Sequence, residues 1–205
     1  MKNLKINYLK NLIKFIFIFI YFFSENAMSE ENYLLKVIEE NWNQTKTLTG
    51  QFYQKIDDEN TLSGDFFIQK PFKSNFTYHN QNENIITSKY FINIINKYGF
   101  LLNRYPIINQ PIYQIFSEEI SLENIFRVRF VEEIEDEIII KLTTKGDSYT
   151  NNVRIRITFN SEDYSLKNWE IIDALGQSTY LEFTNIVKNI SIDQNLFIFK
   201  EKIDY

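Results

Sequence analysis

The chain has 205 residues, 44% of them hydrophobic, and a formal net charge of −5, which together indicate one globular domain. The acidic balance argues against nucleic acid as a partner, because nucleic-acid binding relies on Lys and Arg to neutralise phosphates. Cysteine is absent from the sequence, which excludes disulfides, thiolate metal sites and cysteine nucleophiles. The 19 Phe and 13 Tyr, against 5 Gly and 3 Pro, favour strands over helices.

Residues 1–27 have the layout of a secretory signal peptide. Four lysines come first, an apolar run occupies residues 15–23, and the small residue Ala27 lies beyond it. The run is shorter than the roughly 20 residues that a membrane-spanning helix needs. A leader cleaved after Ala27 and a retained anchor both stay open, and both predict that residues 28–205 are exported as one domain.

An amphipathic helix is predicted from Ser29 to about Lys46. Ser29 is the expected N-cap, and two glutamates in the first turn suit the helix dipole. Apolar residues recur at helical spacing: Leu34, Val37, Ile38 and Trp42. A single apolar stripe implies that the helix lies against a sheet.

Three segments of strict alternation follow between Thr47 and Tyr78, and the third is expected to begin at Phe72. Even positions are mostly apolar or glycine and odd positions are mostly polar, so each segment presents one apolar face. Residues 57–60 and Lys70-Pro71 mark the breaks between segments. The pattern predicts an antiparallel meander with one aromatic face that another element must cover. The aromatic residues of this face are Phe52, Phe66, Phe76 and Tyr78.

The middle of the chain interrupts the strands. Further strands are predicted at 85–88, 90–95 and 100–102. Tyr105–Pro111 then breaks the strand rhythm, and apolar residues including Ile115 and Phe116 follow. One or two short helices are predicted here, with Ser121 as the N-cap of the segment 122–126.

Strands resume towards the C-terminus, and five are predicted: 128–133, 137–143, 153–159, 166–172 and 178–186. Residues 195–199 are expected to close the edge of the sheet. About ten strands, a first helix and a central helical interruption predict a mainly β fold with some α, an unclosed antiparallel half-barrel.

Residues that carry chemistry are scarce. The sequence contains one histidine, His79, in a predicted turn. Without a second histidine or a cysteine, neither a Cys-His pair nor a zinc cluster can be assembled. The acidic run 132–137 lacks the spacing of a calcium loop and predicts a solvated hairpin tip. Nucleophile-elbow, Walker A and Rossmann motifs are absent. These observations favour a non-enzymatic protein without cofactor or metal.

The aromatic face has two interpretations. A barrel just wide enough for its own side chains has a filled core, whereas an opened one can hold a small apolar ligand. Periodicity does not distinguish a packed aromatic core from a ligand cavity, so both alternatives stay open from the residues alone.

Several motifs, by their order and spacing, resemble those of the periplasmic outer-membrane lipoprotein carriers, the LolA family. The resemblance covers residues 30–200. The motifs are Leu48-Thr49-Gly50-x-Phe52-x-Gln54-Lys55, Gly64-Asp65-Phe66-x-Ile68-x-Lys70-Pro71, Phe76-x-Tyr78, Tyr105-Pro106 to Pro111, Asn168-Trp169, Asp173 to Gly176, Phe183-x-Asn185 and Leu196 to Phe199.

The resemblance implies a half-barrel capped by an N-terminal helix and short lid helices, with a hydrophobic cavity between them. Such carriers take acylated lipoproteins from an inner-membrane ABC-type lipoprotein-releasing complex and shelter the acyl chains across the periplasm. They deliver them to an outer-membrane receptor of the same fold. That receptor is anchored through an N-terminal cysteine, which this chain lacks, so a soluble, monomeric carrier is the better match.

The resemblance also implies the site. The cavity would be lined by Phe52, Phe66, Phe76 and Tyr78, with Ile115 and Phe116 from the lid. Lys70 falls where the family has an arginine that is thought to latch the lid through its backbone when the cavity is empty. Lysine keeps the charge but lacks the planar fork, so a solvated strand-end lysine stays open as the alternative.

Two rival functions come from other classes. The first is an envelope lipoprotein sensor or scaffold of similar half-barrel fold, acting by protein–protein contact. The second is an exported hydrolase, which would depend on His79.

Overall fold

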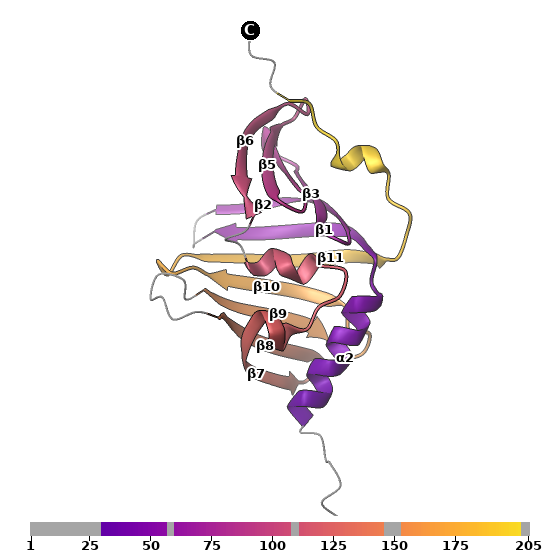
Figure 1. Cartoon of the computed structure of the whole chain (residues 1–205), viewed down its shortest axis with the longest axis vertical. Coiled ribbons are helices and arrows are strands. Elements are labelled where there is room, and N and C mark those ends of the chain that lie inside the picture. Colours follow the sequence, from indigo (N-terminus) through magenta and orange to yellow (C-terminus); the bar gives the residue numbers. More distant parts are fainter. Residues whose placement is uncertain (1–29, 57–59, 108–110, 146–152, 202–205) are drawn as a thin grey trace, which may run out of the picture.

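The computed structural model describes residues 30–56, 60–107, 111–145 and 153–201 (Figure 1). The predicted signal peptide and the predicted N-cap Ser29 lie outside this part of the chain. No helix among the described residues is long and apolar enough to cross a membrane.

A single antiparallel sheet of eleven strands forms the body of the protein and confirms the predicted fold class. Its strands are β1 (Thr47–Ile56), β2 (Asn60–Gln69), β3 (Lys73–Tyr78), β4 (Glu83–Thr87), β5 (Phe91–Asn96), β6 (Leu101–Pro106), β7 (Phe126–Ile134), β8 (Glu137–Thr144), β9 (Arg154–Asn160), β10 (Leu166–Ile172) and β11 (Ser178–Lys188). Their order is β6-β5-β4-β3-β2-β1-β11-β10-β9-β8-β7, so β1 and β11 meet at the centre. The two edge strands, β6 and β7, come from the middle of the chain.

Helical segments cover one face of this curved sheet (Figure 1). They are the helix α2 (Glu30–Gln44), the 3-10 helix η2 (Pro111–Phe116) and the short helix α3 (Leu122–Ile125), while a second 3-10 helix, η4 (Gln194–Phe197), follows β11. The apolar stripe of α2 is buried through Leu34, Leu35, Ile38 and Trp42. The predicted alternation places the aromatic face of the meander beneath these segments.

Two glycines make room for the rings of that face. Gly50 pairs with Phe66 across β1 and β2, and Phe52 pairs with Gly64. A Cβ atom on Gly64 would lie 2.1 Å from the carbonyl oxygen of Thr77 and 2.7 Å from the ring of Phe52. The Gly-x-Phe motif of each strand therefore seats the phenylalanine of its neighbour, which fixes the register of the first hairpin.

Three predictions about strands differ in the structure. The break predicted at Tyr105–Pro111 begins later, because β6 continues through Tyr105 to Pro106 and pairs there with β5. Phe72 does not open the third strand: its φ is +62°, and β3 begins at Lys73. Residues 195–199 do not form an edge strand. They overlap η4, and in the described part of the chain a parallel bridge between Phe100 and Lys200 follows them. The amide side chain of Asn75 donates a hydrogen bond to the Leu196 carbonyl and holds this segment over β3.

The helical interruption is where it was predicted, but its start is stabilised differently. Ser121 precedes α3 without making a side-chain cap. The carboxylate of Glu39 in α2 instead accepts a hydrogen bond from the Leu122 amide. Burial raises the pKa of Glu39 more than this bond lowers it. The orphan amide at the start of α3 is thus satisfied by a neighbouring helix.

Candidate functional site

Six aromatic rings, here called the aromatic cluster, pack between the sheet and η2. They belong to Phe52, Phe66, Phe76, Phe116, Trp169 and Phe183. Ring centroids lie 5.3 Å apart for Phe52 and Phe76, 5.1 Å apart for Phe66 and Phe183, and 4.8 Å apart for Trp169 and Phe183. Phe116 of η2 contacts Trp169 at 5.9 Å. Tilted and edge-to-face contacts of this kind stabilise a core beyond the area that they bury.

All six residues predicted to line a cavity lie in or against this cluster. Phe52 and Phe66 are fully buried, and Phe76, Ile115 and Phe116 are buried as well. Tyr78 is half-buried, with its ring 5.1 Å from that of Phe52. Its hydroxyl donates to Oε1 of Gln54 at 2.6 Å. The rings contact one another, so this region is closed in the structure.

Strands β10 and β11 add cluster residues that were not predicted to line the site. Phe183 pairs with Phe52 across β1 and β11, and Trp169 pairs with Leu181 across β10 and β11. The alternation of inward-facing and outward-facing residues along each strand was the sequence signal that could have identified them. Their meeting with the first meander depends on the pairing of β1 with β11, which no local pattern encodes.

Trp169 brings an unpaired polar group into the cluster. Its indole Nε1–H is buried and has no hydrogen-bond partner in the described part of the chain. The nearest ring, that of Phe183, lies at 76° to the indole. A buried donor without an acceptor costs free energy, so this N–H is available to an oxygen atom that enters the cluster.

Hydrogen bonds from α2 and from the turn after β2 hold η2 and the segment after it. The indole N–H of Trp42 donates to the Ile115 carbonyl at 2.7 Å, and the Phe72 amide donates to the Phe116 carbonyl at 2.8 Å. The side chain of Asn43 brackets Ile120, accepting from its amide at 2.8 Å and donating to its carbonyl at 3.1 Å. Helix α2 and the turn after β2 are therefore the main anchors of η2 and residues 117–120.

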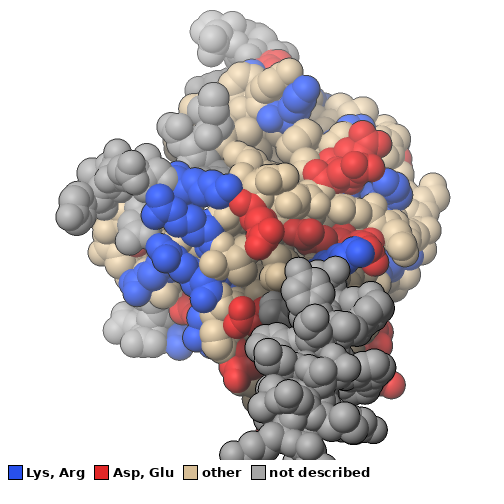
Figure 2. All heavy atoms as spheres, turned by 60° about the horizontal axis from the view of Figure 1, so that its bottom comes forward, with Lys and Arg blue, Asp and Glu red and all other residues tan. Residues whose placement is uncertain are grey.

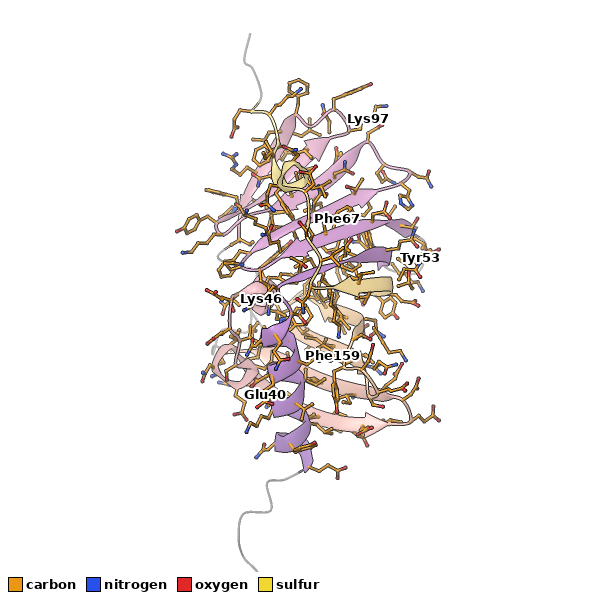
Figure 3. The ribbon with its side chains drawn as sticks, turned by 90° about the vertical axis from the view of Figure 1, so that its right-hand side faces the viewer. Glu40, Lys46, Tyr53, Phe67, Lys97 and Phe159 are labelled. Carbon is orange, nitrogen blue, oxygen red and sulfur yellow. The ribbon has the colours of Figure 1, made fainter. Side chains whose placement is uncertain are left out.

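Trp42 also packs on the far part of the sheet. Its ring centroid lies 6.4 Å from that of Phe159 and 6.3 Å from that of Phe116. Figure 3 shows Phe159 beside α2, whereas Tyr53 of β1 lies on the side of the sheet away from the helix. Trp42 thus joins α2, η2 and β9 at one point.

Lys70 is buried beneath the end of α2. Its Nζ donates to the Trp42 carbonyl at 2.6 Å and lies 5.1 Å from the centroid of the Trp42 ring. Burial, aided by the positive charge of Lys46, lowers the pKa of Lys70 to about 8. Lys70 is not a solvated lysine, and in this closed state it contacts η2 indirectly, through Trp42.

The residues considered for other chemistry lie at the surface. Nε2 of His79 is 2.9 Å from Oδ2 of Asp65, in an exposed pair. The acidic run 132–137 spans the end of β7, the turn at Glu135 and Asp136, and the start of β8, as predicted. Within the described ranges no group of His, Asp and Glu could hold a metal ion.

Solved structures match the chain at low identity and low TM-score. A LolA superfamily protein from Nitrosomonas europaea matches at 10% identity and a TM-score of 0.42, covering 80% of this chain and 97% of that one. An outer-membrane lipoprotein-sorting protein domain from Vibrio parahaemolyticus matches at 10% identity and a TM-score of 0.48, covering 82% of this chain and 94% of that one. MucB, solved in complex with MucA, matches at 8% identity and a TM-score of 0.46 over 82% of this chain. That match spans only 59% of MucB.

The sequence itself carries the assignment. No curated protein matches it. The family model described as "Outer membrane lipoprotein carrier protein LolA" matches residues 43–200, which include every strand of the sheet, η2, α3 and the whole aromatic cluster. The chain therefore belongs to the LolA family of outer membrane lipoprotein carrier proteins.

Proposed function

We propose that this protein is a non-enzymatic carrier that binds the acyl chains of lipoproteins between its sheet and η2. One observation supports this most directly: the residues expected to line a cavity converge in one apolar region beneath a segment that Trp42 and Phe72 hold by hydrogen bonds. In this proposal the N-terminal 27 residues direct export. The carrier then collects cargo from an inner-membrane lipoprotein-releasing complex and delivers it to an outer-membrane receptor.

The apolar character of the cluster suits this task. Burying an acyl chain is worth about 0.8 kcal/mol per CH₂ group, so an acyl chain does not cross water unescorted. Phenylalanine rings offer the chain a surface without strong hydrogen bonds, which allows release as well as binding. When the carrier is empty, the rings pack on one another and keep water out.

Opening in this proposal proceeds through α2. Lys70 holds the carbonyl of Trp42, and the indole of Trp42 holds the carbonyl of Ile115. Lys70 then acts as a latch in two steps, because loss of its bond frees the end of α2, and movement of Trp42 frees η2. An arginine could form further hydrogen bonds at this position, so a lysine makes a latch that releases more easily.

Photocrosslinking tests this function directly. A benzophenone amino acid replaces Tyr113, which packs on the cluster from η2, or Tyr53, which lies on the outer face of β1. The probes are a synthetic triacylated lipopeptide and the same peptide without acyl chains. We expect a crosslink only between position 113 and the acylated probe, because only that position faces the proposed cargo.

Native mass spectrometry of the full chain with the same probes gives the opposing outcome. A mass that stays free of lipopeptide, together with no crosslink at either position, would mean that the aromatic cluster is a permanently packed core. The protein would then fit a sensor or scaffold that acts through protein–protein contact.

A further inference from the structure

Arginine is concentrated on the outer face of the sheet. The chain has 22 basic residues, of which five are arginines: Arg104, Arg127, Arg129, Arg154 and Arg156. Four of these lie on β7 and β9, on either side of Lys141 in β8. In a chain that otherwise uses lysine for its positive charges, this distribution singles out one surface.

The register of the strands assembles these side chains into one patch. Lys141 pairs with Phe130 on one side and Arg156 on the other. Thr143 in the same way pairs with Arg127 and Arg154. We call the five cations the arginine face: Arg127, Arg129, Lys141, Arg154 and Arg156. All five are exposed, and they appear as the blue group at the left in Figure 2.

The arginine face is separate from the aromatic cluster. Residues that alternate with it along β8 and β9 point into the core, and they are buried: Ile140, Leu142, Ile155 and Ile157. A pocket of about 340 Å³ is hollowed into the outer face, with Arg129, Lys141, Arg154 and Arg156 in its wall. A molecule bound there would leave the cargo site accessible.

Cross-strand pairing acts on this concentration of charge in two opposite ways. Like charges directly opposite each other on neighbouring strands are destabilising, and Lys141 lies opposite Arg156. On its other side Arg156 lies opposite Glu170 of β10, which also accepts a hydrogen bond from the Ser178 hydroxyl. The described lining of the pocket therefore holds four cations and one carboxylate.

The chemistry of arginine specifies the kind of partner. Its planar fork donates two parallel hydrogen bonds to a carboxylate or phosphate, which a lysine does not. Acidic residues at the far end of the β7–β8 hairpin, including Glu132, Glu133 and Glu135, are exposed. Figure 2 shows acidic side chains next to the basic group on the same face. A uniformly anionic bilayer would be repelled by these residues and by the net charge of −5. A short acidic segment can contact the arginines alone.

We propose that the arginine face is a docking surface for an acidic segment of a partner protein, bound through bidentate arginine–carboxylate pairs. This inference does not depend on the proposed cargo site. Docking on the outer face leaves η2 and the aromatic cluster uncovered, so the same molecule can be held by a partner while its cargo site opens.

A designed peptide tests the proposal with the full chain. The probe is a fluorescent peptide of eight glutamates, with the matching glutamine peptide as its control. The double variant Arg154→Gln/Arg156→Gln should weaken glutamate-peptide binding by about tenfold or more, since hydrogen bonds between charged groups are lost. Arg154→Lys/Arg156→Lys keeps the charge and should weaken binding by about threefold through loss of the fork.

The matched control is Lys36→Gln/Lys55→Gln, which removes the same charge from exposed positions on α2 and β1. It should leave the peptide affinity within about twofold of the wild type, because charges far from the peptide are screened. Equal losses in the control and the arginine variant would overturn the proposal in favour of non-specific attraction.

A vesicle experiment separates a protein partner from a membrane. Wild type and Arg154→Gln/Arg156→Gln are compared on vesicles of phosphatidylglycerol and phosphatidylcholine. Because both proteins share the same N-terminal segment, a difference between them reports only the arginine face. We expect no difference. Arginine-dependent binding to phosphatidylglycerol without peptide binding would assign the surface to lipid headgroups and overturn the proposal.

Discussion

Lys70 couples the charge of one buried amine to the stability of the whole molecule. Its pKa is about 8 in the folded protein, against about 10.4 for an exposed lysine. Between these values the unfolded chain binds the proton more tightly, so the free energy of unfolding should rise with pH from about 8 to about 10.4. At about 1.4 kcal/mol per pH unit, Lys70 accounts for about 3 kcal/mol of that rise.

The variant Lys70→Met should lose this pH dependence while keeping the side-chain volume. Urea unfolding at pH 7.5 and pH 10.5, compared between Lys70→Met and wild type, measures it. Lys36→Met, which removes an exposed lysine, should behave as the wild type does. An unchanged pH dependence in Lys70→Met would show that its amine is solvated in solution.

Gly64 tests how tightly the rings are seated. A methyl group at this position meets a backbone oxygen that cannot rotate away. Gly64→Ala should therefore lower the free energy of unfolding by about 3 kcal/mol, at the upper end of the cost of overpacking. Ser63→Ala, one residue away, should stay within about 0.5 kcal/mol of the wild type. Equal stabilities of the two variants in urea unfolding would contradict the reciprocal glycine–phenylalanine packing.

Single residues also show how far the sequence could predict the site. Phe52, Phe66 and Phe76 were placed together because alternation on a strand determines the face of each side chain. The burial of Lys70 could not be predicted, because lysine is almost always at the surface, and its partner Trp42 is 28 positions away in the sequence. Contacts between residues far apart in the sequence produce no periodic pattern from which they could be predicted.

At the scale of elements, the two tryptophans offer a matched comparison of how η2 is held. Each packs against Phe116, but only Trp42 donates its indole hydrogen bond to η2. Trp42→Phe and Trp169→Phe remove the same atoms from buried positions. Trp42→Phe should lower the free energy of unfolding by about 1–2 kcal/mol more than Trp169→Phe does, because it leaves the Ile115 carbonyl without its hydrogen-bond donor.

Urea unfolding measures the loss of stability in each variant, and hydrogen exchange shows which part of the structure is affected. In Trp42→Phe the amide of Phe72, which bonds the Phe116 carbonyl of η2, should exchange faster. Exchange at the β1–β11 ladder should change only as much as the global stability does. Equal costs and equal exchange in both variants would mean that Trp42 does not hold η2.

Most elements were predictable because strand alternation and helical spacing are local properties. The errors occurred where an external contact decides the conformation. Phe72 continues the apolar parity of its segment, yet its amide bonds η2 instead of a neighbouring strand. Residues 196–199 form an apolar run that suits a strand, but this segment lies over β3 and gains a hydrogen bond from Asn75 there. Ser121 has the right position for a cap, but Glu39 supplies the bond.

At the scale of the whole molecule, cargo binding should require movement between α2 and the segment after η2. The double variant Asn43→Cys/Ile120→Cys introduces two thiols at positions that already share hydrogen bonds, into a chain without other cysteines. Once the two thiols are oxidised to a disulfide, uptake of the triacylated lipopeptide should fall by about tenfold or more, and a reductant should restore it. The reduced form is its own control. Undiminished uptake by the oxidised form would place the entrance elsewhere.

The two edges of the sheet are joined by a single stretch of chain. Strand β6 ends at Pro106, β7 begins at Phe126, and the connection between them carries both η2 and α3. A load that spreads the edges of the sheet must therefore pull on both ends of this connection. The curvature of the sheet and the position of η2 should then change together. Cargo that widens the space between the sheet and η2 would pull on the connection between β6 and β7, and this tension would be felt at the surface of the protein.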